Sequence, residues 1–255
     1  MLKKLLLLLI LSTGANATTF STDYTDLWWD PAEDGWGVNV IQQGDTLFAT
    51  FFIYSSGRAP SWYVASETTF SRLQAGAPVF SGPIYQTSGP WFGGPFDSAT
   101  VTRRLVGSAT FTFPSVTGGT LSYSIDGVTV NKNITRQTWR VNNLGGDYLG
   151  GAIGTHFGCA TNGLLEEAAI ISVTHSGPNI SLATFQNSGS CTYSGTYQQA
   201  GKMGSASGTV ACSDGRQGTF AATEMDASAW GFTAHVTAQL GGSCTWSGKL
   251  GGLKR

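Results

Sequence analysis

Apolar and polar residues alternate along most of the chain, most clearly from Gly35 to Tyr54. Two apolar runs flank Gly44-Asp45 there, and a two-residue loop that begins with glycine is typical of a type I′ or II′ β-hairpin. With these residues as the turn, Gln43 pairs with Thr46. One face then collects an almost purely apolar row, which is predicted to face a core because a one-residue slip would scatter it. The row is Trp36, Val38, Val40, Leu47, Ala49, Phe51 and Ile53.

The opposite face of this hairpin is aromatic without being uniformly apolar. It carries Gly35, Gly37, Asn39, Ile41, Phe48, Thr50, Phe52 and Tyr54. Phe52 falls opposite Gly37 and Tyr54 opposite Gly35, so both rings have bare backbone beside them. This second face is where a ligand site is expected.

A second hairpin turns at Asp126-Gly127, a type I′ signal that sets Ile125 against Val128 and Tyr123 against Val130. Between the two hairpins the pattern predicts shorter strands near 60–66, 78–85 and 106–113, with a Pro- and Gly-rich loop at 86–96.

The second half has the spacing of a sandwich or barrel, with no convincing helical periodicity. Leu164 to Ile171 comes closest to a helix and reads equally well as a strand. Strands are expected near 147–152, 168–175, 179–185, 190–198, 206–212, 217–225, 230–239 and 243–251. Asn-Asn-Leu-Gly-Gly within 141–146 is the expected linker. The predicted fold is all-β and antiparallel, with barrel- or sandwich-like domains at 18–142 and 143–255; one long sheet is the alternative.

The four cysteines all lie in the second half, where two disulfides are expected. A turn at Ala200 to Met203 places Cys191 opposite Cys212, which favours that bridge and leaves Cys159 to pair with Cys244. Four cysteines allow three connectivities. Zinc ligation is the other interpretation, although no Cys-x2-Cys pair occurs.

The first residues have the form of a secretory signal peptide. Lys3 and Lys4 precede an apolar run from Leu5 to Leu11, and Ala15-Asn16-Ala17 is a small-residue cleavage site. The mature chain is expected to begin at Thr18. As a helix the run would cover only about 10 Å, against a hydrocarbon core of about 30 Å, so it is not expected to be a membrane anchor. A secreted or periplasmic protein with no transmembrane span after cleavage is predicted.

The amino-acid composition argues against a nucleic-acid-binding protein and against a disordered chain. Charged residues make up 11% and the net charge is −1, so nucleic acid is not an expected partner. The chain holds 35 Gly, but also 8 Trp, 8 Tyr and 14 Phe, which indicates a folded core with many turns rather than disorder.

Three motifs of the first half resemble a module of a bacterial secreted β-protein family whose function is uncharacterised. They are Leu27-Trp-Trp-Asp-Pro-Ala-Glu-Asp-Gly-Trp-Gly-Val-Asn, Gly44-Asp-Thr-Leu-Phe-Ala-Thr and Gly57-Arg-Ala-Pro-Ser-Trp-Tyr63. The second half, with Cys191-Thr-Tyr-Ser-Gly and Cys212-Ser-Asp-Gly, is similar to the disulfide-bearing half often attached to that module. The resemblance implies export and a β fold, and brings no catalytic residues.

Aromatic side chains are the first candidates for a site. Exposed rings on a sheet can stack on sugars or other planar ligands, whereas rings that fill the core cannot. The predicted ligand-binding residues are Trp28, Phe52, Tyr54, Trp62 and Tyr63. The leading hypothesis is an exported binding or interaction protein whose ligand is a small molecule, a glycan or another protein. No cofactor or metal is expected.

Two alternatives remain open. Asp30, Glu33 and Asp34 share one loop and would serve as acid and base in an extracellular hydrolase, or as oxygen ligands for calcium, although a solvated turn explains them as well. An outer-membrane or structural surface protein is the other alternative. His156, His175 and His235 belong to no catalytic or metal motif.

Overall fold

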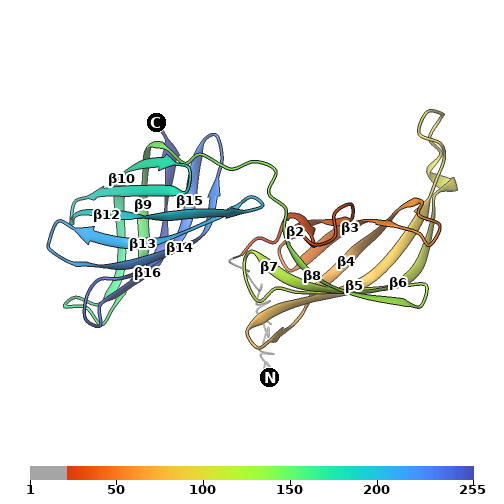
Figure 1. Ribbon diagram of the computed structural model, residues 1–255, viewed down its shortest axis with the longest axis horizontal. Coiled ribbons are helices and arrows are strands. Elements are labelled where there is room, and N and C mark those ends of the chain that lie inside the picture. Colours follow the sequence, from red (N-terminus) through yellow and green to blue (C-terminus); the bar gives the residue numbers. More distant parts are fainter. Residues whose placement is uncertain (1–21) are drawn as a thin grey trace, which may run out of the picture.

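The structure is a computed structural model that describes residues 22–255. These residues form two closed, antiparallel, eight-stranded barrels that follow one another along the chain (Figure 1). The predicted fold class, all-β with two consecutive barrel-like domains, is therefore confirmed. The expected signal peptide at 1–17 and the expected mature start at Thr18 lie outside the described residues.

The first barrel is an up-and-down meander closed by pairing of its first and last strands. Its strands are β1 (Asp26–Trp29), β2 (Gly37–Gln43), β3 (Thr46–Tyr54), β4 (Pro60–Gln74), β5 (Ala77–Ser88), β6 (Thr102–Thr112), β7 (Gly118–Ile125) and β8 (Val128–Arg136). A short 3₁₀ helix, η1 (Ser98–Thr100), lies in the loop between β5 and β6, which extends away from the barrel (Figure 1).

The second barrel has the same meander, and β9 closes it by pairing with β16 as well as β10. Its strands are β9 (Gly146–Phe157), β10 (Gly163–Ser176), β11 (Asn179–Gln186), β12 (Gly189–Ala200), β13 (Met203–Cys212), β14 (Gln217–Ala227), β15 (Gly231–Gln239) and β16 (Thr245–Lys254). Residues 137–145 connect the barrels, and the expected linker at 141–146 overlaps them except at its last residue.

Both predicted hairpin turns are confirmed. Gly44 has a φ of 60°, and Gln43 pairs with Thr46 across the turn. Asp126 and Gly127 have φ values of 47° and 83°, the positive pair that a type I′ turn requires. Because each turn fixes the register of its ladder, the predicted inner and outer faces of these strands follow.

The predicted apolar row lies inside the first barrel. Five of its members are fully buried: Val38, Val40, Leu47, Ala49 and Phe51. The other two, Trp36 and Ile53, are partly buried and pack against this core. Other rings fill the remaining interior, including Phe80 of β5, Phe111 of β6 and Phe113 just after β6. The first barrel is therefore a packed core rather than a channel.

The strands β4 and β5 are longer than predicted, and β1 was not predicted. Ala75 and Gly76 join β4 to β5 with φ values of 49° and 83°. Alanine rarely adopts a positive φ, so this turn gave no recognisable signal in the sequence. The strand β1 holds only four residues, too few for alternation to stand out.

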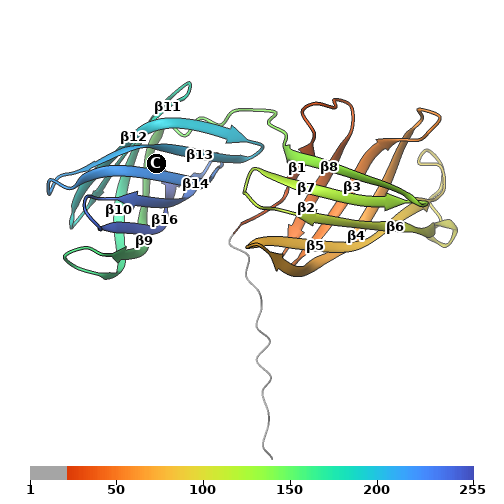
Figure 2. The same cartoon turned by 60° about the horizontal axis from the view of Figure 1, so that its bottom comes forward.

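Hydrogen bonds around Asp26 connect the two barrels. Arg136 Nη1 donates to Asp26 Oδ2 at 3.0 Å, and the backbone N–H of Lys202 donates to the same oxygen at 2.9 Å. Lys202 lies in the β12–β13 turn, which reaches toward the first barrel (Figure 2). At its neighbour Gly201, with a φ of 60°, a Cβ atom would stand 2.1 Å from Asp26 Oδ2, so glycine is required there.

Candidate functional site

Three exposed aromatic side chains gather on the outer face of β3 and β4. Phe52, Tyr54 and Trp62 are 51%, 57% and 53% exposed. Phe52 pairs directly with Trp62, and Tyr54 pairs with Pro60, two residues before Trp62. Since residues two apart on a strand share a face, all three rings point away from the core. We call Phe52, Tyr54 and Trp62 the aromatic platform.

The paired residues next to the platform on β2, β3 and β4 are small and uncharged. Gly37 pairs with Phe52 and leaves bare backbone on the far side of that ring. One step further along the same face, Asn39 pairs with Thr50, and Thr50 pairs with Val64. A hydroxyl and an amide therefore lie beside the rings. Further along this row Val64 pairs with Tyr85, and the guanidinium of Arg103 lies 4.6 Å from the centre of the Tyr85 ring.

Trp28, one of the predicted ligand residues, lies inside the first barrel and not on the platform. Trp28 is 0% exposed in the core of the first barrel, where its ring lies 4.9 Å from that of Phe113. Its Nε1–H donates to the backbone oxygen of Tyr24 at 3.0 Å, and the guanidinium of Arg136 covers the ring at 4.8 Å. Trp28 is buried because β1 turns it inward and Arg136 closes the remaining side.

Tyr63 does not belong to the platform either. It pairs with the fully buried Phe51 and packs against the core of the first barrel. Adjacent residues of a strand point to opposite faces, so Trp62 and Tyr63 cannot present their rings on one surface. Of the five predicted ligand residues, the structure brings together Phe52, Tyr54 and Trp62.

The loop that carries Asp30, Glu33 and Asp34 makes contacts that stabilise the structure. The carboxylate of Glu33 contacts Lys132 Nζ at 2.6 Å and accepts a hydrogen bond from Trp36 Nε1 at 2.9 Å. Asp30 accepts the backbone N–H of Ala32 within its own turn. Asp30, Glu33 and Asp34 line neither of the two pockets described below. Among residues 22–255, the groups of side chains close enough to hold a metal ion do not include these three carboxylates.

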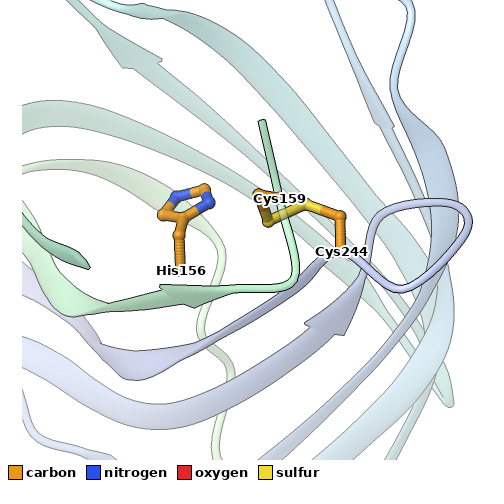
Figure 3. Close-up of side chains that lie close together, drawn as sticks. All are labelled: His156, Cys159 and Cys244. Carbon is orange, nitrogen blue, oxygen red and sulfur yellow. A yellow bond between two sulfur atoms is a disulfide. The ribbon is translucent and has the colours of Figure 1, made fainter. Parts of the chain in front are cut away.

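The three histidines do not converge. His235 lies within β15, and His175 accepts the backbone N–H of Leu144 on Nδ1 at 3.2 Å, with its ring edge against Tyr197. His156 lies beside the Cys159–Cys244 bridge in the second barrel (Figure 3).

Two disulfides join Cys191 to Cys212 and Cys159 to Cys244, the connectivity favoured by the sequence register. Candidate ligand atoms of His156, Cys159 and Cys244 lie within 4.8 Å of one another. Because those two sulfurs are bonded to each other, they offer no thiolate, and the zinc interpretation does not hold for the bridged chain. The two bridges indicate an oxidising compartment.

Burial of His156 makes the stability of the protein depend on pH. Burial, followed by the positive charge of Arg216, lowers the pKa of His156 below its ordinary 6.5. Just below pH 6.5 the unfolded chain therefore takes up a proton that the folded chain does not, so stability falls as the pH drops. We therefore expect the free energy of unfolding, measured in urea, to fall less between pH 7.5 and 5.5 in His156→Gln than in the wild type. Equal losses would contradict this.

The structure also contains two pockets that the sequence did not indicate. One, of about 610 Å³, opens at the disulfide-bearing end of the second barrel. The other, of about 510 Å³, lies beside the exposed side chains of Leu149, Trp230 and Leu253. Each is lined by residues from distant strands and turns, so no contiguous motif marks it.

Within residues 22–255, no helix is long and apolar enough to cross a membrane. No protein-family model matches the chain, and no curated protein matches its sequence.

Proposed function

We propose that this is an exported binding protein and that its aromatic platform binds carbohydrate. Aromatic rings present a flat apolar face with a negative quadrupole, which suits the C–H-bearing face of a sugar ring. The hydroxyl of Thr50 and the amide of Asn39, in the next row of the sheet, can hydrogen-bond sugar hydroxyls. Because none of the paired residues beside the rings on β2, β3 and β4 is charged, this part of the sheet suits a neutral saccharide.

The observation that carries the proposal is the exposed cross-strand pair of Phe52 and Trp62. The interior of this barrel is already filled by other rings, so these two are not needed for the core. Adjacent exposed aromatic residues on a sheet cost solubility, and such patches commonly mark binding surfaces.

Export is the second part of the proposal. Two disulfides indicate an oxidising environment, and the signal-peptide pattern at 1–17 directs the chain to the periplasm or the cell exterior. Membership of the bacterial secreted family that the first half resembles is part of the same proposal. It rests on the Trp- and Gly-containing motifs quoted above.

A glycan array tests the carbohydrate proposal. We expect the wild type to bind a subset of glycans and Trp62→Ala to lose at least about tenfold in affinity, since exposed stacking contacts are removed without disturbing the fold. Trp230→Ala is the matched control because Trp230 is 79% exposed on the other barrel. It should bind as the wild type does.

Two results would remove the proposal. One is a wild type that binds no glycan. The other is a Trp62→Ala variant that binds every glycan as well as Trp230→Ala does.

A further inference from the structure

The end of the second barrel that carries both disulfides opens into a pocket of about 610 Å³, a size common for small-molecule sites. Four connections surround it: β9–β10, β11–β12, β13–β14 and β15–β16. Buried apolar residues form its inner wall: Ala152, Leu240, Trp246 and Leu250. Polar side chains such as Asn162 and Ser188 stand at its outer part. The two disulfides also line it, and each joins neighbouring strands at this end of the barrel.

Trp246 has a hydrogen-bond donor without an acceptor. Its side chain is 5% exposed and lines the pocket, and its Nε1–H has no partner among the described residues. A Cβ atom at Gly154 would lie 2.9 Å from Cε2 of the indole, so the ring uses space that only glycine leaves. A buried donor without a partner is unfavourable and is uncommon in native structures. The Nε1 atom exposes less than 1 Å², so an acceptor that enters the pocket would relieve this if the indole turns slightly to meet it.

The pocket presents no net charge. Its charged residues are Asp214 and Arg216, which pair with each other at 2.7 Å. Burial lowers the pKa of His156 and raises that of Tyr193, so both side chains are neutral near pH 7. A charged ligand would lose its hydration without gaining an unpaired counter-charge, which disfavours ionic molecules.

We propose that this pocket is a second binding site, which takes a small, uncharged, largely apolar molecule with a carbonyl or ether oxygen. That oxygen accepts the hydrogen bond from Trp246 Nε1, while Leu240, Leu250 and the disulfides contact the apolar part. The site lies on the other barrel from the aromatic platform and does not depend on it.

Two dyes test this site in the full chain. Prodan is an uncharged naphthalene with one ketone oxygen, and anilinonaphthalene sulfonate is of similar size but anionic. We expect prodan to bind with a blue-shifted emission and the sulfonate to bind at least about tenfold more weakly. Trp246→Phe should weaken prodan binding by about tenfold, because the ring remains and only the N–H is lost. The melting temperature of this variant should stay the same or rise, since an unpaired donor has been removed.

Further variants locate the dye. Leu165→Trp fills the pocket and should abolish prodan binding, whereas Trp62→Ala should leave it unchanged even if glycan binding is lost. In nitrogen–proton spectra, the indole resonance that disappears in Trp246→Phe should shift when prodan is added to the wild type. The proposal is overturned if that resonance does not move, or if Trp246→Phe binds prodan as the wild type does. It is also overturned if the sulfonate binds as tightly as prodan.

Discussion

Replacing Arg136 with methionine is expected to lower the free energy of unfolding by about 3–5 kcal/mol. The Arg136 side chain is fully buried, pairs with Asp26 at 3.0 Å, and donates to the backbone oxygens of Val116 and Asp23 at 2.6 Å each. Its guanidinium also lies over the ring of Trp28. Methionine keeps the apolar stem but removes the positive charge that pairs with Asp26 and the donor to the backbone oxygens of Val116 and Asp23. Removing one partner of a buried ion pair is strongly destabilising because the other charge stays buried.

Urea unfolding followed by tryptophan fluorescence measures this effect. Arg104→Met is the matched control, because Arg104 pairs with Asp126 in solvent at 55% and 52% side-chain exposure. Exposed pairs of this kind contribute little to stability. If both variants unfolded at the same urea concentration, the buried cluster around Asp26 would not have the role assigned to it.

Removing the Cys159–Cys244 bridge with two serines is expected to cost about 2–5 kcal/mol of stability. This bridge has a sequence separation of 85, against 21 for Cys191–Cys212, and a cross-link that closes a longer loop restricts the unfolded chain more. The double variant Cys159→Ser/Cys244→Ser should therefore be less stable than Cys191→Ser/Cys212→Ser.

Urea unfolding without reductant gives the comparison. Alkylation and mass spectrometry should find no free thiol in either variant, which establishes that the remaining bridge is intact. A larger loss in Cys191→Ser/Cys212→Ser would contradict the loop-length argument. No loss in either would mean that the bridges do not constrain the chain.

The hairpins could be predicted from sequence because their turn residues have few conformational choices. Gly44-Asp45 and Asp126-Gly127 each permit a tight reversal, and each reversal sets the register of two strands. The turn at Ala75-Gly76 could not be predicted, because alanine there adopts a positive φ that its own preference disfavours. The conformation of that turn is set by the pairing of β4 and β5 with their neighbouring strands.

The candidate site was predictable in part. Strand alternation correctly places Phe52 and Tyr54 outside the first barrel, and the same alternation would have separated Trp62 from its neighbour Tyr63. Strand alternation alone could not predict that Trp28 is buried. Its burial depends on Arg136, which lies far along the chain and becomes its neighbour only when β1 pairs with β8.

The pocket of the second barrel had no sequence signal. Trp246 alternates with polar residues as any core residue of a strand does, and its unpaired N–H is a property of the surrounding space. That space forms only when four connections meet at one end of the closed barrel. Sequence spacing carries no information about such a volume, because its lining residues belong to different strands and turns.

Carbohydrate binding by the aromatic platform can be measured as retention of the intact protein on insoluble cellulose, chitin and peptidoglycan. We expect the wild type to be retained on at least one of them and Phe52→Ala/Trp62→Ala to be released, with unchanged circular dichroism. Trp91→Ala, at an exposed ring in the β5–β6 loop, should be retained like the wild type. Equal retention of the wild type and the platform variant, or no retention of the wild type on any of the three, would contradict it.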